Sequence, residues 1–313
     1  MQVCGACDMV QRSEDTWKKS GIWWQRMLWF VGFAVLLYVA LVVAMVVMER
    51  HFIFLPSRYD AAAFVPPTPA PQSRYPELED VWLTASDGTR IHSWFCRPAV
   101  ARPGGGHIPI ETGMTLLWLH GNAGHIAARY DIIGLFTAIP VNVFIIDYRG
   151  YGQSEGQPTE AGIYLDAAAA WQYLTEDRGI AGDRIVIFGK SLGGGPATEL
   201  ASKVEAAGLI LQSTFTSIPD LANACYPFIP KFVVRSQMSS IDKIGAIGYP
   251  KMIIHGPADE IIPYRMGRKL FDTASEPKTF YEVPDAGHND TFAVGGAAYV
   301  AAVRAFIEGC TPE

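Results

Sequence analysis

The chain has 313 residues, of which 50% are hydrophobic and 18% charged, and its net charge is −6. This composition is too apolar for a disordered protein, and the length allows one large domain with an appendage. The 30 Gly and 21 Pro follow no fixed period and the five Cys are scattered, which excludes collagen-like and disulfide-scaffold proteins. The acidic balance, without clusters of Lys and Arg, argues against a nucleic-acid partner.

An uncharged apolar run lies near the N-terminus, at residues 27–48. At about 1.5 Å per residue, a helix of this length spans a hydrocarbon layer of about 30 Å. Trp23, Trp24 and Trp29 gather at its N-terminal end, as in an interfacial aromatic belt. A cleaved signal peptide would have a shorter apolar core, and a buried core helix seldom runs this long without a charge. We therefore predict one transmembrane helix at 27–48, after an N-terminal tail at 1–26.

The charges that flank this run predict its orientation, because Lys and Arg gather on the cytoplasmic side of a membrane span. Four basic residues precede the run, and two, Arg50 and Arg58, follow it closely. The main domain is therefore expected on the non-cytoplasmic side, which is periplasmic, extracellular or lumenal. A Pro- and Ala-rich composition predicts a spacer at 49–76. Cys4 and Cys7 have no further metal ligands close in sequence, so we expect neither a zinc site nor another cofactor.

The third part of the chain, residues 77–313, alternates short β-rich runs with longer helical ones, as in a mostly parallel sheet covered by helices. A turn at Asp87 and Gly88 predicts a hairpin of the strands 80–84 and 89–96. The later runs are nearly all apolar, which is typical of parallel strands buried on both faces. We expect these strands at 115–119, 141–146, 184–188, 208–211, 251–254 and 278–283, and helices at 126–138, 159–177, 192–206, 262–274 and 291–308.

The segment 213–249 breaks this alternation, because prolines interrupt its apolar residues and no strand pattern is present. We interpret it as a small helical lid inserted after a strand, and an irregular loop packed on the sheet edge is the alternative. The apolar residues of such a lid can line a hydrophobic pocket, which favours an acyl ester or another lipid-like substrate.

The sharpest motif is Gly189-Lys190-Ser191-Leu192-Gly193, between an apolar strand and a helix. This G-x-S-x-G pattern is typical of a tight turn that raises the serine hydroxyl above a sheet, and the turn needs residues without bulk on both sides. A serine hydroxyl is a weak nucleophile until a base takes its proton. A histidine and an acid are therefore expected later in the chain, each after a strand.

Asp259 and His288 meet this expectation, because each follows a predicted strand and the order Ser, Asp, His is the one that such sites use. His288 is the predicted base for Ser191, and Asp259 is predicted to hold the imidazole in the required tautomer. Glu260 and Asp285 are rival candidates for the acid, since both lie in the same two loops.

A tetrahedral intermediate also needs two amide donors for its oxyanion. The N–H of Leu192, directly after the serine, is one candidate. The second is expected from the loop after the strand 115–119, where we assign the N–H of Asn122, with Ala123 as the alternative. Four other polar residues near strand ends are interpreted as groups that orient loops: His120, His255, Asp147 and Arg149.

Five motifs in this order resemble the α/β-hydrolases over residues 77–308. They are HGNAG at 120–124, DYRGYGQS at 147–154, GKSLGG at 189–194, HGPADEIIP at 255–263 and GHND at 287–290. Their combination is similar to the membrane-anchored bud-emergence (Bem) type of serine hydrolase. The resemblance implies an α/β-hydrolase fold with helices on both faces of the sheet, the triad Ser191, Asp259 and His288, and an ester, thioester or amide as target. Lys190 departs from the pattern, in which Arg is more common.

The sequence therefore predicts a membrane-anchored serine hydrolase that cleaves acyl esters or thioesters, of the carboxylesterase, lipase or thioesterase type. A role in lipid metabolism fits the apolar lid. The alternatives are a peptidase with the same fold and a non-catalytic membrane receptor or scaffold.

Overall fold

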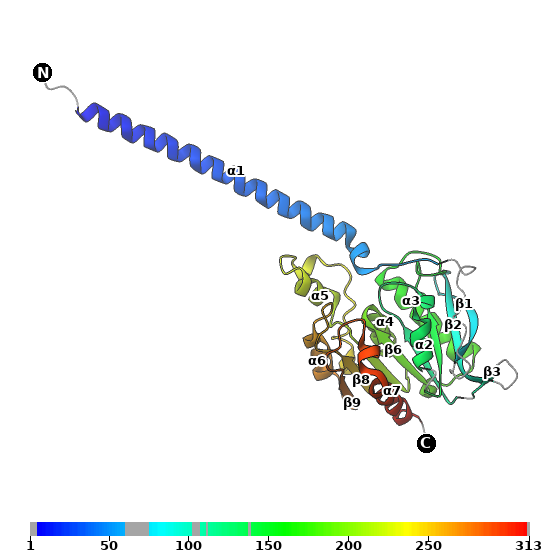
Figure 1. Cartoon of the computed structure of the whole chain (residues 1–313). Coiled ribbons are helices and arrows are strands. Elements are labelled where there is room, and N and C mark those ends of the chain that lie inside the picture. Colours follow the sequence, from blue (N-terminus) through cyan, green and yellow to red (C-terminus); the bar gives the residue numbers. More distant parts are fainter. Residues whose placement is uncertain (1–4, 60–74, 102–106, 111, 137–138, 312–313) are drawn as a thin grey trace. The chain divides into compact units, whose positions relative to one another are not determined.

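A computed structural model describes residues 5–59, 75–101, 107–110, 112–136 and 139–311, and Cys4 lies outside them, as does the side chain of Cys7. The chain divides into two units, residues 1–49 and residues 50–313. Helix α1 (Gly5–Ile53) makes up the described part of the first unit and supplies the first residues of the second (Figure 1). It begins well before the predicted span at 27–48 and ends five residues after it.

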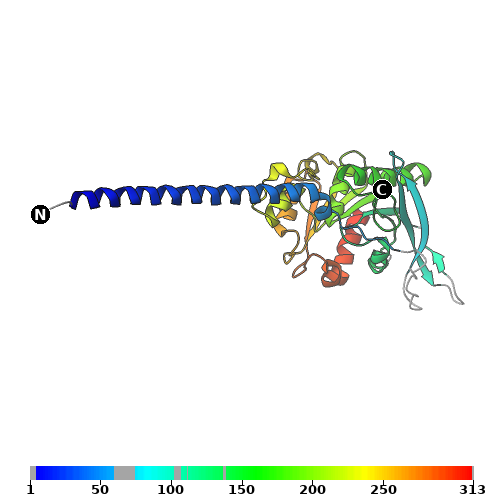
Figure 2. The ribbon, with the colours of Figure 1, turned by 90° about the horizontal axis from the view of Figure 1, so that it is seen from above.

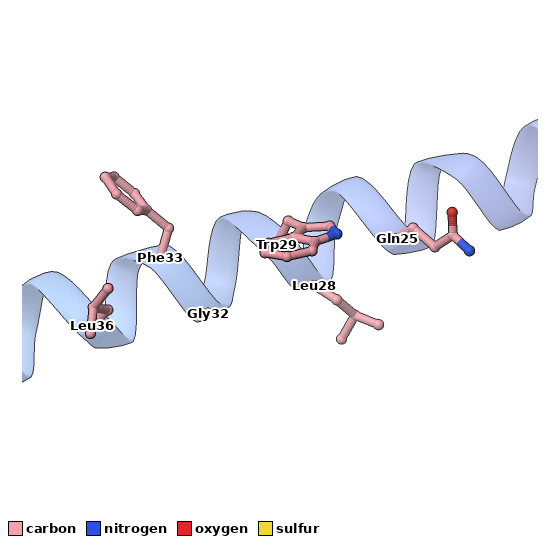
Figure 3. A pocket seen from close by; sticks show the side chains of 6 residues that line it. All are labelled: Gln25, Leu28, Trp29, Gly32, Phe33 and Leu36. Carbon is pink, nitrogen blue, oxygen red and sulfur yellow. The ribbon is translucent and has the colours of Figure 1, made fainter.

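Helix α1 is long and apolar enough, between Trp23 and Ile53, to cross a membrane. Its most apolar window has a mean hydropathy of 2.9, and none of that window is buried in the structure. Figure 3 shows side chains that extend from this ribbon around Gly32, among them Trp29, which is 81% exposed. Apolar surface of this extent needs an apolar environment or a partner.

The second unit is built on a nine-stranded sheet with the order β1-β2-β5-β4-β6-β7-β8-β9, in which β3 pairs with β2. Strands β1 (Tyr75–Thr84), β2 (Arg90–Ala101) and β3 (His107–Pro109) run antiparallel to their neighbours. All other neighbours are parallel, so the residues that follow these strands meet at one edge of the sheet. The parallel strands are β4 (Met114–Leu119), β5 (Val141–Ile146), β6 (Ile185–Lys190), β7 (Gly208–Gln212), β8 (Lys251–His255) and β9 (Lys278–Glu282).

Helices cover both faces of this sheet (Figures 1 and 2). Successive strand residues point to opposite faces, so Leu117 and Trp118 belong to two separate core clusters. Helices α2 (Tyr130–Phe136) and α7 (Thr291–Gly309) pack in the cluster of Trp118. The cluster of Leu117 contains α3 (Glu160–Gln172), α4 (Gly194–Ala201) and α6 (Tyr264–Thr273).

The second helix long and apolar enough to span a membrane is α7. It contributes Phe292, Tyr299, Val303 and Ile307 to the core, so we treat it as a core helix of the domain. The remaining short turns are η2 (Ile126–Arg129), η4 (Gly182–Arg184), η5 (Ser191–Gly193), η6 (Lys231–Val233), η7 (Ile244–Ala246) and the π-helical turn η3 (Tyr173–Asp177).

The predicted fold is confirmed, and each predicted strand lies within a few residues of an observed one, although β1 and β2 are longer than predicted. Strand β3 was not predicted, because three residues carry too little pattern. The segment 213–249 contains helix α5 (Ile218–Cys225) and two short turns. It therefore combines features of both interpretations, the helical lid and the irregular loop. Ser217 begins α5, since its side chain accepts a hydrogen bond of 3.1 Å from the N–H of Asp220.

A buried ion pair joins the hairpin turn, the loop after β5 and helix α3. The Arg149 guanidinium lies 2.8 Å from the Asp166 carboxylate and 2.6 Å from that of Asp87. The side chain of Asp166 is fully buried, whereas that of Asp87 is 39% exposed. Gly162 makes room for this arginine, since a Cβ there would lie 2.4 Å from the side chain of Arg149. This agrees with the interpretation of Arg149 as a residue that orients loops.

We expect Arg149→Met to lower the free energy of unfolding by about 3 kcal/mol or more, because it leaves Asp166 as a lone buried charge. Urea unfolding of the full chain in detergent, followed by tryptophan fluorescence, measures the loss. Asp87→Asn is the matched control at the exposed end of the same network, and we expect a clearly smaller loss. Equal losses in the two variants would contradict this account.

Candidate active site

Ser191 lies on the tight turn between β6 and α4. Its φ is 53°, in the left-handed region that non-glycine residues rarely adopt. The backbone oxygen of Ser191 accepts a hydrogen bond of 2.7 Å from the buried hydroxyl of Thr214, which helps to hold this conformation. Backbone strain of this kind persists where the surroundings enforce it, and such places are often functional sites.

Gly193 is required by the close approach of this turn to the end of β4. A Cβ at this position would lie 2.0 Å from the backbone oxygen of Leu119 and 2.7 Å from that of His120. Both obstacles are backbone atoms, which cannot move away as a flexible side chain can. The second glycine of the motif therefore sets how closely the serine turn and the loop after β4 can approach each other.

We expect Gly193→Ala to lower the thermal unfolding midpoint by about 6 °C or more, since backbone must shift to admit the methyl group. Calorimetry of the full chain in detergent measures the change. Gly195→Ala is the matched control, because the nearest atoms to a Cβ there are side-chain atoms of Met238, at 3.2 Å, and not backbone. A midpoint for Gly193→Ala as high as that of Gly195→Ala would refute the close-approach argument.

The structure brings together the three residues predicted for the triad, from three separate loops. The Nε2 of His288 lies 2.9 Å from the Ser191 hydroxyl oxygen, and its Nδ1 lies 2.8 Å from Oδ2 of Asp259. All three residues are buried, with exposed fractions of 8% for Ser191, 5% for His288 and 9% for Asp259. These distances suit proton transfer from the hydroxyl to the imidazole.

Asp259 is held by several donors besides His288. Its Oδ1 accepts hydrogen bonds from the N–H groups of Ile261 and Ile262, at 3.0 and 2.7 Å, and its Oδ2 lies 3.2 Å from Nε2 of His255. Burial alone would raise the pKa of Asp259, but the hydrogen bonds from His255, His288 and Ile262 outweigh it and lower the pKa. The carboxylate is therefore ionised at neutral pH and faces the imidazole as a full charge.

The two rival acids occupy other places. Glu260 accepts a hydrogen bond of 3.1 Å from the backbone N–H of His288, so it contacts the loop that carries the imidazole. Asp285 lies in the turn after β9, with a φ of 62°. Of the three candidates, the structure places Asp259 at the Nδ1 of His288.

The other polar residues near strand ends contact loops, as predicted. Nδ1 of His120 lies 2.7 Å from the backbone oxygen of Gly121, and burial lowers the pKa of His120 to about 4, so its ring is neutral at pH 7. Asp147 accepts a hydrogen bond of 2.8 Å from the N–H of Ile126. Across the described residues, no three His, Cys, Asp or Glu side chains are grouped so that they could hold a metal ion.

Asn122, predicted to supply an oxyanion amide, lies in the loop beside the serine turn. A Cβ on the preceding Gly121 would be 3.3 Å from that of Ser191, which shows how close the loop comes. The side-chain oxygen of Asn122 accepts two hydrogen bonds, from the N–H of Leu55 at 2.8 Å and from the hydroxyl of Tyr151 at 2.9 Å. Two donors from different segments thus fix this side chain. Leu192, the other predicted donor, follows the serine directly in η5.

A cavity of about 460 Å³ opens at the serine, which is within the usual size of small-molecule sites. Its walls are mostly apolar. Besides the serine turn and the loops after β4 and β9, they come from the end of α1, the segment around α5 and the loop after β8. The residues that line it include Phe52, Ile53, Leu55, Asn122, Leu192, Ser191, Phe215, Ile218, Leu221, Tyr226, Ile261 and His288.

The wall formed by Phe52, Ile53 and Leu55 was not predicted, because these residues were expected in a spacer. The structure shows instead that this segment packs on the domain, where Gly152 donates a hydrogen bond of 2.8 Å to the backbone oxygen of Ser57. The available signal was the apolar run at 52–55, directly after the polar residues 49–51. The rest of the predicted spacer, from residue 60 to 74, lies outside the described residues.

The sequence is similar to curated proteins over nearly its whole length. It is 35% identical over 304 residues to the alpha/beta hydrolase domain-containing protein WAV2 of Arabidopsis thaliana. The alignment covers 91% of this chain and 95% of the relative. The chain belongs to the α/β-hydrolase superfamily. The human alpha/beta hydrolase domain-containing protein 17B is 39% identical to this α/β-hydrolase over 196 residues, which covers 62% of this chain and 66% of the relative.

Two further comparisons agree with this membership. The family described as serine aminopeptidase, S33 matches residues 111–244. Among solved structures, the Pyrococcus furiosus esterase Pf2001 is similar with a TM-score of 0.62 at 20% identity, over 82% of this α/β-hydrolase and 98% of the esterase. At that identity the likeness concerns the fold.

Proposed function

We propose that this α/β-hydrolase is a membrane-anchored serine hydrolase that cleaves acyl ester or thioester bonds through an acyl-enzyme. The observation that carries the proposal is the pair of hydrogen bonds that link Ser191 to His288 and His288 to Asp259. The membership of the chain in a hydrolase superfamily supports it. The cavity at the serine adds an apolar surface suited to an acyl chain.

In the first half of the proposed reaction, Ser191 attacks the acyl carbon while His288 takes the hydroxyl proton. The negative charge that develops on the carbonyl oxygen needs amide donors, and the N–H groups of Leu192 and Asn122 are the proposed ones. Asp259 stabilises the imidazolium that forms and fixes the imidazole tautomer. His288 then gives the proton to the departing alcohol or thiol, which leaves the acyl group on the serine oxygen.

In the second half, His288 takes a proton from water, and the resulting hydroxide attacks the acyl carbon. The same two amides stabilise the second tetrahedral intermediate. The proton returns to Ser191 as the carboxylic acid leaves, so the free enzyme is restored. In total, one ester or thioester and one water are consumed, and one carboxylic acid and one alcohol or thiol are released.

We expect Ser191→Ala to abolish labelling by a fluorophosphonate probe and to lower kcat for p-nitrophenyl esters by about 10⁵-fold or more, because the nucleophile is lost. Asp259→Asn should lower kcat by about 10⁴-fold, since it removes the charge that faces the imidazolium. Steady-state kinetics of the full chain in a neutral detergent measure both.

Ser202→Ala, at the exposed end of α4, is the matched control and should keep both labelling and turnover. Labelling that persists in Ser191→Ala would contradict the assignment of Ser191 as the nucleophile. A wild-type chain that does not react with the probe would favour a non-catalytic scaffold. Peptide amides cleaved faster than acyl esters would instead favour a peptidase, the activity for which the matching family is named.

The membrane part of the proposal rests on helix α1, whose segment Trp23–Ile53 has the length and hydropathy of a span. Four basic residues precede the uncharged run and two follow it, which supports a placement of the hydrolase domain on the non-cytoplasmic side. Such a span also accounts for an apolar window of which no part is buried in the structure.

We expect the full chain to stay in the membrane pellet after an alkaline carbonate wash, as a spanning helix would. In sealed membranes, protease added on the non-cytoplasmic side should digest the domain and spare the N-terminal tail. The matched control is protease added after the membranes are opened with detergent, which should digest both parts. Protection of the domain from the non-cytoplasmic side would reverse the proposed orientation, and release by carbonate would rule out the span.

A further inference from the structure

Two cations, Lys190 and Arg129, line the cavity that opens at Ser191, and no Asp or Glu is among the described residues that line it. The domain as a whole has the opposite balance, because residues 61–313 contain 19 Lys and Arg against 26 Asp and Glu. A cleft lined by one sign of charge concentrates ligands of the other sign. The cavity is thus locally positive in an otherwise acidic domain.

Lys190 is the last residue of β6 and is only 8% exposed. Its ammonium lies 5.0 Å from the ring centroid of Phe292, and it forms no hydrogen bond or ion pair with any residue in the described ranges. Lysine is rarely buried without a partner, since the ammonium loses hydration that nothing replaces. An anion bound in the cavity would supply the ion-pair partner that the ring of Phe292 does not.

The two carboxylates that raise the pKa of Lys190, those of Asp259 and Asp290, accept hydrogen bonds from other groups. Asp259 accepts the hydrogen bonds of the triad and its loop, and Asp290 accepts one of 2.7 Å from the N–H of Gly287. Burial and the nearby Arg129 lower the pKa of Lys190 to about 8, against the opposing effect of these two carboxylates. The ammonium is therefore mostly protonated at pH 7.

Arg129 brings a second cation of different geometry. Its hydrogen bond to the described part of the chain goes from Nη2 to the backbone oxygen of Ala123. The other N–H groups of its planar guanidinium are free of hydrogen bonds to described residues, and they match the oxygens of a carboxylate or phosphate. Because Lys190 is adjacent to the serine in the chain, an anion bound here lies close to the reacting bond.

We propose that Lys190 and Arg129 bind an anionic group, a phosphate or a carboxylate, that the acyl ester carries near its scissile bond. The inference rests on the proposed hydrolase function, because it names the substrate class of the same cavity. The apolar wall takes the acyl chain and the two cations take the charged part. The substrate is therefore an anionic amphiphile, whose hydrolysis releases a fatty acid and a small anionic alcohol.

Three dodecanoyl esters with one three-carbon backbone test this inference on the full chain in a neutral detergent. They are 1-dodecanoylglycerol, which is neutral, 3-dodecanoylglycerate, which carries a carboxylate, and 1-dodecanoylglycerol 3-phosphate. Released dodecanoate gives kcat/KM for each ester. We expect the wild type to prefer at least one anionic ester over the neutral one by tenfold or more, and the better of the two identifies the anion.

Three variants assign the preference to Lys190. Lys190→Met should lower the ratio of anionic to neutral kcat/KM by about tenfold, whereas Lys190→Arg, which keeps the charge, should retain most of it. Lys203→Met is the matched control, because its side chain is 65% exposed and pairs with Glu199; it should keep the wild-type ratio. Fluorophosphonate labelling of each variant reports whether the serine turn has formed.

A wild-type ratio near one overturns the inference without recourse to any variant. If the Lys190→Met variant is labelled by the fluorophosphonate, so that its serine turn is intact, and its ratio of anionic to neutral kcat/KM equals that of the wild type, the inference is also overturned. Failure of the proposed function looks different, because then none of the three esters is hydrolysed and the wild type is not labelled at Ser191. Hydrolysis of the neutral ester at the same rate as the anionic ones leaves the hydrolase function standing and rejects the anion site alone.

Discussion

The close approach of the serine turn to the end of β4 is the constraint on which the arrangement of the site depends. Gly193 lies against the backbone oxygens of Leu119 and His120, so the loop after β4 and the turn after β6 are held at a fixed separation. Parallel pairing of β4 with β6 delivers both segments to the same edge of the sheet. Ser191, whose backbone is left-handed, and the loop of Asn122 are therefore brought close together by backbone packing, in which the side chains of Ser191, Asp259 and His288 take no part.

The acid side of the site depends on hydrogen bonds in the same way. Asp259 is buried, yet its carboxylate receives donors from its own loop, from His255 and from His288. These donors offset the cost of removing a charge from water, which keeps the group ionised where an isolated buried carboxyl would be neutral. His255, at the end of β8, contributes its ring to this network and also contacts the backbone oxygen of Ile262. His255, which is not one of the three predicted residues, thus helps to keep the Asp259 carboxylate charged.

The sequence was sufficient to predict the sheet, because buried parallel strands are apolar along their whole length and the G-x-S-x-G motif marks the turn between one of them and a helix. It also identified Ser191, Asp259 and His288, which lie at predicted strand ends and which the structure brings within hydrogen-bonding distance. Contacts between segments distant in the chain leave no local pattern. The donor from Leu55 to Asn122 was missed for this reason, and the apolar run at 52–55 did not by itself show that it packs at the cavity. Strand β3 was missed because it is only three residues long.

The end of helix α1 and the residues just after it are a structural part of the cavity, since Phe52, Ile53 and Leu55 line it and the N–H of Leu55 donates a hydrogen bond to Asn122. A chain truncated so that it begins at residue 75 would keep Ser191, Asp259 and His288 but lose one wall of the cavity and one of the two groups that fix Asn122. Residues 52–55 therefore belong to the folded domain, and a fragment that is to keep the cavity intact must begin before Phe52.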